Sequence, residues 1–200
     1  MPRQLVPGLY HWTAFHPGIG SRVSSYYLEP ADAVLDPKCP EEGWDAIPGY
    51  VRQVLLTSGH HTRDAAELAD RLSIPVRASP QAADHIGGAL DVEVFTDGSE
   101  AAPGITAIHI GVLSDDEGAF HIAVDDGAIA FADGLISHGD EIGFVPDELM
   151  GDDPEGVKQG LTEAFRGLLD LDFDHLLFAH GDPVIGGGKT SLRAFLADRR

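Results

Sequence analysis

The stretch VLLTSGHHTRDAAELADRL, residues 54–72, decides how the rest of the chain is interpreted. It begins as an apolar strand that ends at Thr57, and a helix with regularly spaced apolar residues is predicted to begin near Thr62. The short loop between them carries His60 and His61. Clustered imidazoles at a strand-to-helix turn are typical of metal-binding enzymes, because their nitrogens are good ligands for zinc and iron. The stretch therefore raises the question of whether this loop holds a metal.

The order of the predicted elements around this stretch indicates the fold class. Predicted strands cover residues 22–29, 31–37, 51–58, 74–79, 92–95, 104–110, 118–124, 127–133 and 173–180. Predicted helices cover residues 62–72, 80–86, 154–171 and 190–200. Because helices follow strands without strict alternation, the pattern favours a layered αβ protein with mixed sheets over a doubly wound parallel sheet.

Length and composition predict a single domain, residues 1–200. A chain of 200 residues with 43% apolar content can bury one sizeable core, and neither a repeat nor a linker divides it. No apolar run approaches the roughly 18 residues of a membrane span, and the N-terminus lacks the apolar segment of a signal peptide. The single cysteine, Cys39, cannot form an internal disulfide. We therefore expect a cytoplasmic protein that does not contact a membrane.

The chain is strongly acidic, which excludes some classes of partner. Its formal net charge is -20, from 33 acidic and 13 basic residues. Like charge repels nucleic acid and anionic membrane surfaces, so we expect neither as a partner and expect a small-molecule substrate or ligand instead. Two explanations of the acidity stay open: a GC-rich genome that makes lysine rare, or halophilic adaptation to a salt-rich cytoplasm that screens the self-repulsion.

Four segments in a fixed order carry a resemblance to a known family. SSYYLEPADAVLDP (24–37) is an opening hairpin that ends in Asp after an apolar strand, and LLTSGHHTRDA (55–65) is the histidine loop. GAIAFADGLI (127–136) is a strand that ends in Asp, and HLLFAHGDPV (175–184) is a final strand that ends in His before Gly. Together they resemble the metallo-β-lactamase superfamily over nearly the whole chain. The resemblance implies an αββα sandwich, in which two mixed β-sheets pack face to face with helices outside.

The resemblance also implies a set of metal-ligand positions, and this chain has lost most of them. In the family, a Thr-His-x-His-x-Asp-His loop and three later residues hold two metals. Aligned on Thr57, the ligand types are kept at three positions: His60, Asp133 and His180. They are changed at the other four: Ser58, Thr62, Arg63 and Leu113. Hydroxyl groups are weak zinc ligands, leucine cannot ligate, and a guanidinium has no free lone pair. A standard two-zinc centre is therefore not expected.

Two interpretations of the remaining residues stay open. In the first, His60, Asp133 and His180 hold one zinc or iron ion that activates water. The protein would then be a divergent metal-dependent hydrolase of a small ester, thioester, lactone or phosphoester, with Arg63 contacting an anionic group of the substrate. A mononuclear iron oxidoreductase on the same scaffold is a further possibility.

In the second interpretation no metal is bound. Arg63 replaces it and pairs with Asp133, because a buried carboxylate at a strand end needs a positive partner. The protein would then be catalytically silent and would bind a ligand or a partner.

Several other residues have simpler predicted roles. His61 is expected to face solvent or a neighbouring loop, and His85 is expected at the surface or in packing. The aromatic segment at residues 10–20 is expected to form a loop that overhangs the site, with His11 and His16 as weak candidates for substrate contact. GGGKTS at residues 186–191 fails the spacing of a phosphate-binding loop and is interpreted as a turn before a helix.

Overall fold

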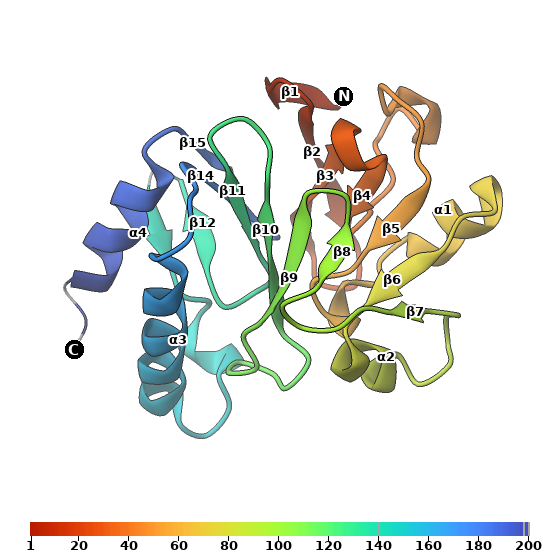
Figure 1. Ribbon diagram of the computed structural model, residues 1–200. Helices are drawn as coiled ribbons and strands as arrows, with labels where there is room; N and C mark the ends of the chain where they lie inside the picture. Colours follow the sequence, from red (N-terminus) through yellow and green to blue (C-terminus); the bar gives the residue numbers. More distant parts are fainter. Residues whose placement is uncertain (140, 198, 200) are drawn as a thin grey trace.

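The computed structural model describes residues 1–139, 141–197 and 199. In this part of the chain two β-sheets lie face to face, with a pair of helices outside each of them (Figure 1). The predicted αββα sandwich with two mixed sheets is therefore confirmed. Within the described residues, none of the helices has the length and apolar character needed to cross a membrane.

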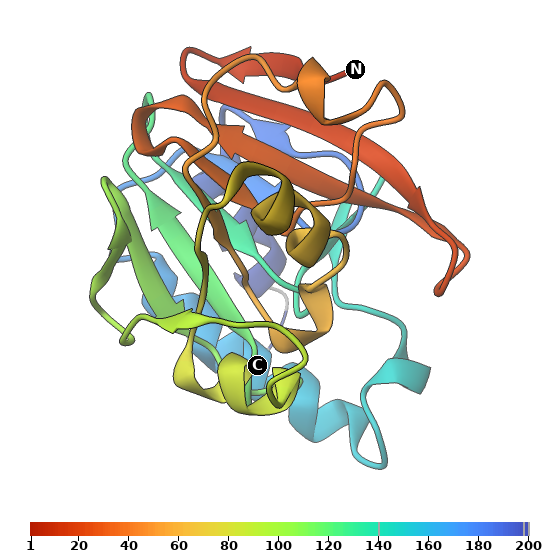
Figure 2. The same ribbon diagram turned by 90° about the vertical axis from the view of Figure 1, so that its right-hand side faces the viewer.

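The first sheet contains its strands in chain order, from β1 to β7. Their bounds are β1 Arg3–Val6, β2 Leu9–His16, β3 Ser21–Leu28, β4 Ala33–Leu35, β5 Gln53–Leu55, β6 Val76–Ala78 and β7 Glu93–Val94. Strands β1 to β4 are antiparallel, and β4 to β7 are parallel. Figure 2 shows the long β2–β3 hairpin from the side. Residues 3–16 therefore form two strands, and the expectation of a loop over residues 10–20 was wrong for most of that segment.

The second sheet has the strand order β15-β14-β11-β10-β9-β8. Its strands are β8 Glu100–Ala102, β9 Ile105–His109, β10 Gly118–Ile122, β11 Ala128–Phe131, β14 His175–Phe178 and β15 Val184–Ile185. Among the described residues of this sheet, only β11 and β14 pair in parallel. A separate small ribbon pairs β12 Ile136–His138 with β13 Glu141–Gly143.

The helices cover the two outer faces of the sheets. They are α1 Ala65–Leu72, α2 Pro80–Ile86, α3 Pro154–Leu168 and α4 Gly188–Ala197. Apolar side chains of α1 and α2 pack on the first sheet, and those of α3 and α4 pack on the second. A third apolar cluster fills the space between the sheets, where Leu28, Leu55, Phe120 and Leu177 are buried. Burial of this apolar surface on both sides of each sheet is the main source of stability for such a layered fold.

Short 3₁₀ segments occur where the chain turns sharply. They are η1 Glu29–Ala31, η2 Trp44–Ala46, η3 Gly59–His61 and η4 Asp147–Leu149. The third of them changes the predicted start of the first long helix. Helix α1 begins at Ala65 and not near Thr62, because η3 and a positive φ of 41° at Arg63 come first. This extra turn sets the direction of every side chain in the histidine loop.

Candidate metal site

Parallel strand pairs bring the key residues to one edge of the sandwich. Strands β11 and β14 pair in parallel with Phe131 opposite Phe178. Two residues further along each strand are Asp133 and His180, so this register places the two side chains near each other. In the first sheet the parallel pair β4 and β5 ends in the same way, just before Asp36. The carboxyl ends of both strand pairs therefore supply the site.

The end of β14 is fixed by hydrogen bonds from the first sheet. The hydroxyl of Tyr26 donates to the carbonyl of Phe178 at 2.8 Å and accepts from its N–H at 3.0 Å. The N–H of Ser24 donates to the carbonyl of Ala179 at 2.9 Å. These bonds between the sheets hold the backbone immediately before His180 in place.

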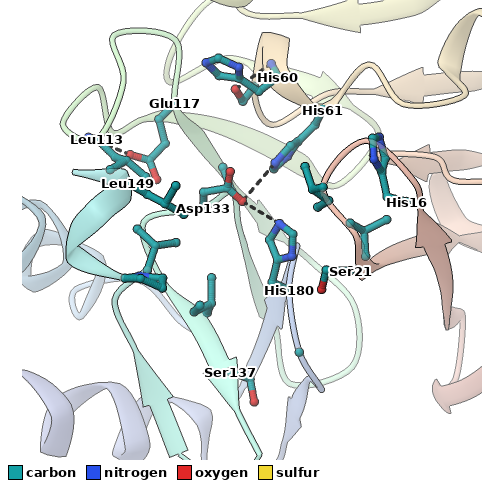
Figure 3. A pocket seen from close by; sticks show the side chains of 18 of the residues that line it. His16, Ser21, His60, His61, Leu113, Glu117, Asp133, Ser137, Leu149 and His180 are labelled. Atoms are coloured by element: carbon teal, nitrogen blue, oxygen red, sulfur yellow. Dashed lines mark hydrogen bonds and ion pairs between the residues drawn. The ribbon is translucent and has the colours of Figure 1, made fainter. Parts of the chain in front are cut away.

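Three side chains converge at the edge between the sheets. Oδ1 of Asp133 lies 3.2 Å from Nε2 of His61 and 3.3 Å from Nε2 of His180 (Figure 3). One donor atom from each residue lies within 4.8 Å of the others, which is close enough for all three to contact one metal ion. His61 is buried, whereas Asp133 and His180 are partly exposed. The structure therefore brings together two of the three residues expected here, Asp133 and His180.

The third position belongs to His61 and not to His60. His60 is exposed and points away, with its ring centroid 4.1 Å from that of His85. The cause is η3, which begins after Ser58 and has only three residues per turn. Adjacent side chains on such a turn point about 120° apart, so two neighbouring histidines cannot face the same point. The family alignment assumed another backbone path, and the expectation that His61 faces solvent was wrong.

His61 is held from its far side by a buried carboxylate. Its Nδ1 lies 3.0 Å from Oδ2 of Asp36 and 2.8 Å from the hydroxyl of Thr57. Asp36 also accepts hydrogen bonds from the hydroxyl of Thr57 at 2.6 Å and from its N–H at 2.9 Å. A histidine that binds a metal usually donates its other nitrogen to a carboxylate in this way, which fixes the tautomer and the ring orientation. In the sequence, Asp36 was only a landmark at the end of a strand.

Arg63 does not pair with Asp133 as expected. Its Nη1 donates to the carbonyls of Ser24 at 2.6 Å and Asp36 at 2.7 Å. Its Nη2 is buried and has no hydrogen-bond partner among the described residues. Ser24 lies on β3 and Asp36 directly follows β4, so the guanidinium binds backbone carbonyls of the first sheet. Asp133 contacts His61 and His180 instead.

The charges in this cluster shift one another strongly. Burial opposes a charge on His61, but the carboxylates of Asp133 and Asp36 outweigh it and raise the pKa of His61 to about 9. Burial also opposes ionisation of Asp133, yet contact with His61 and His180 holds its pKa well below the ordinary range. The pKa of Asp36 is lowered as well, against its burial, mainly by His61. Without a metal, the site is therefore a chain of a carboxylate, an imidazolium and a second carboxylate.

A further acid was missed by the sequence interpretation. Glu117 is buried beside the site, and its carboxylate accepts hydrogen bonds from the N–H groups of Gly134 at 2.6 Å and Leu113 at 3.2 Å. Burial outweighs these bonds and raises the pKa of Glu117 to about 7. In the sequence this residue ends a polar, acidic run, residues 114–117, that is typical of a solvated loop. Only the contact with the turn after Asp133 reveals its position.

The cluster opens into a pocket of about 880 Å³. His16 lies at its wall, as do His61, Asp133 and His180 (Figure 3). Much of the remaining wall is apolar and comes from Ile19, Val23, Leu113, Ile136, Val145 and Leu149. A pocket with apolar wall residues and a few convergent polar groups is the usual form of a small-molecule site.

No protein-family model matches the sequence, and neither does any curated protein. Solved structures do match the fold. The DIM-1 metallo-β-lactamase superposes with a TM-score of 0.74 at 9% identity, over 100% of this chain and 98% of that one. A metallo-β-lactamase family protein from Thermus thermophilus gives 0.68 at 15% identity, over 98% and 80% of the two chains.

The chain has the metallo-β-lactamase fold. The flavodiiron protein from Giardia intestinalis also matches, with a TM-score of 0.68 at 14% identity over 98% of this chain and 58% of that one. Because identities are this low and the matched proteins differ in name, the metallo-β-lactamase fold alone does not assign a reaction.

The residues at the pocket edge fit one metal ion and not a two-metal centre. His61, Asp133 and His180 offer the two imidazoles and one carboxylate of a mononuclear site. The positions that would complete a second centre are used otherwise. Ser58 donates its hydroxyl to Asp116 at 2.8 Å, and Leu113 presents an apolar side chain to the pocket. A separate group, formed by His60, His85 and Asp116, also has donor atoms within 4.8 Å of one another.

Proposed function

We propose that this protein is a hydrolase that uses one metal ion, held by His61, Asp133 and His180, to activate water. The observation that supports it most is the double role of His61. Its Nε2 faces the shared oxygen of Asp133, while its Nδ1 is held by Asp36 at 3.0 Å. A histidine fixed in this way needs no rearrangement to bind a metal, so the ordering has already taken place on folding.

Zinc is the first choice of metal and iron the second. Two imidazoles and a carboxylate form a catalytic zinc set that leaves a position for water, and the same set serves iron. When bound, such an ion supplies hydroxide near neutral pH and polarises a carbonyl or phosphoryl oxygen. The retained donor types would also suit an iron oxidoreductase, which is why the identity of the metal is part of the test.

The surrounding residues of the chain would orient the substrate. The apolar pocket wall suits the hydrocarbon part of a small ester, thioester, lactone or phosphoester. Arg63 lines this pocket, and the positive charge of its guanidinium would attract a carboxylate or phosphate group of the substrate. Glu117, whose pKa of about 7 allows both protonation states near neutrality, would accept a proton from the attacking water.

A metal-free binding protein is the second candidate, and one observation favours it. His61, with a pKa raised to about 9, is a cation between Asp36 and Asp133 at neutral pH. This imidazolium already balances the two carboxylates, in the role first expected of Arg63. The pocket would then bind a small ligand without reacting with it.

Metal analysis combined with hydrolysis assays separates the candidates. The protein is purified without chelator, its zinc and iron contents are measured, and esters, thioesters, lactones and phosphoesters are screened with added Zn²⁺, Mn²⁺ or Fe²⁺. We expect metal-dependent hydrolysis that Asp133→Asn and His61→Gln abolish. The matched control is His109→Gln, which changes an exposed histidine outside both donor groups. Complete inactivity together with no metal uptake would contradict the hydrolase and support the metal-free candidate.

A further inference from the structure

A second group of ligand side chains lies outside the pocket cluster. His60 comes from η3, His85 from α2, and Asp116 from the segment between β9 and β10. One donor atom of each lies within 4.8 Å of the others. The two imidazole rings are 4.1 Å apart between centroids and tilted by 57°. Three segments that are distant in sequence thus converge on one surface point.

The carboxylate of Asp116 is held in a fixed orientation by hydrogen bonds. Its Oδ2 accepts hydrogen bonds from the hydroxyl of Ser58 at 2.8 Å and from the N–H of Gly59 at 2.6 Å. The hydroxyl of Ser114 donates to its Oδ1. The residue is buried at 4% exposure, so its carboxylate is fixed in the protein and does not move freely in solvent. Carboxylates that bind metals are held by hydrogen bonds from outer groups in this manner.

The close approach of α2 to η3 positions His85. A Cβ atom at Gly59 would lie 2.9 Å from the Cβ of His85 and 2.9 Å from the carbonyl oxygen of Ala82. Glycine at this position therefore lets the helix lie directly on the histidine turn. The result is that His85 and His60 face each other across a fixed backbone contact.

The ring nitrogens of both histidines remain available. In the part of the chain that the structure describes, no protein group hydrogen-bonds a ring nitrogen of His60 or His85. Both side chains are exposed, so an ion can reach them from solvent. Two neutral imidazoles and a carboxylate, with water in the fourth position, form a tetrahedral zinc set.

We propose that His60, His85 and Asp116 form a second zinc site, which fastens η3, α2 and the segment before β10 to one another. Ser58 and Ser114, which hold Asp116, also line the pocket, so the ion would stabilise this part of the pocket wall. The site uses no residue of the pocket cluster and does not depend on the proposed hydrolase. Adjacent histidines in one turn would thus serve two separate ions.

Zinc titration of chelator-treated protein by calorimetry tests the proposal, with the thermal midpoint as a second readout. Wild type should bind two ions per chain, and His85→Gln should bind one. His61→Gln should lose the ion of the pocket cluster and keep the ion held by His60, His85 and Asp116. The control His109→Gln should bind both ions. Ser114→Ala should weaken zinc binding at the second site by about 10-fold or more, because it removes a hydrogen bond to the carboxylate of Asp116. If the pocket cluster binds no metal, wild type should bind one ion that His85→Gln loses.

The proposal would be overturned if His85→Gln left the zinc stoichiometry and affinity unchanged. In a folded variant, as judged by circular dichroism, that result would show that His85 is not a ligand. NMR resonances of the His60 and His85 rings provide an independent readout, and their insensitivity to added zinc would also refute the site.

Discussion

Replacing His61 with glutamine should remove a large part of the pH dependence of stability in the metal-free protein. The side chain is 5% exposed and lies between Asp36 and Asp133, which raise its pKa from 6.5 to about 9 against the effect of burial. At about 1.4 kcal/mol per pH unit, the difference between these pKa values corresponds to about 3 kcal/mol in the free energy of unfolding. This is a large share of the stability of an ordinary domain, which is about 5–15 kcal/mol.

The sign of the effect follows from the direction of the pKa change. The folded state binds the proton more tightly than the unfolded state, so the stabilisation is fully present below pH 6.5. It is lost as the pH rises through about 9. Both carboxylate partners stay ionised throughout this window, because their pKa values are lowered. The expected curve for wild type therefore falls between these limits, and the curve for His61→Gln is flatter.

Urea unfolding of chelator-treated protein at a series of pH values measures this difference. We expect wild type to lose about 3 kcal/mol more than His61→Gln across the window, and His109→Gln to behave like wild type. Equal slopes for wild type and His61→Gln would refute the reasoning. Should the variant not fold, NMR titration of the His61 ring in wild type gives the same answer, and a midpoint near or below the ordinary histidine value would contradict it.

Three further predictions concern residues around the site and the charge of the whole chain. Arg63→Lys should destabilise the protein by about 2 kcal/mol in urea unfolding, because the lysine side chain is one atom shorter and would not reach the carbonyls of Ser24 and Asp36, to which Nη1 of Arg63 donates; unchanged stability would contradict this role. Glu117→Gln should be more stable than wild type at about pH 9 but not at about pH 4. Burial raises the pKa of Glu117 from 4.5 to about 7, so its stabilising contribution is present below pH 4.5 and lost as the pH rises through about 7; a constant difference across pH would oppose this. The thermal midpoint should rise in molar KCl, because salt screens a net charge of -20, and a midpoint indifferent to KCl would leave a GC-rich genome as the explanation of the acidity.

The sequence was informative where a residue's position follows from the end of a strand. Asp133 and His180 each follow an apolar strand, and the structure places both at the same edge because β11 and β14 pair in parallel. Periodicity located the ends of the two strands, but only the resemblance to the metallo-β-lactamase superfamily implied that Asp133 and His180 meet, because a residue pattern does not say which strands are neighbours. The layered architecture follows from the same apolar patterns.

The sequence was misleading where a short turn sets the direction of a side chain. His60 and His61 are adjacent, and the sequence alone does not indicate which of the two side chains points into the pocket. The 3₁₀ turn of η3 makes that choice, and its start depends on the hydrogen bond from the N–H of His60 to the hydroxyl of Ser58. The same holds for Arg63, whose guanidinium binds the backbone carbonyls of Ser24 and Asp36 and does not pair with Asp133.

By itself the sequence determined the composition of this site: which donor types are present, which are lost, and which strands end beside them. Through the family alignment it also predicted that a standard two-metal centre is lost, because leucine and arginine side chains cannot ligate a metal. Tertiary structure alone decided the partners. In the folded chain His61 contacts Asp36 and Asp133, His60 packs against His85, and Glu117 is buried. These contacts join residues that are far apart along the chain, and their geometry is fixed by the packing of whole sheets, which local sequence does not encode.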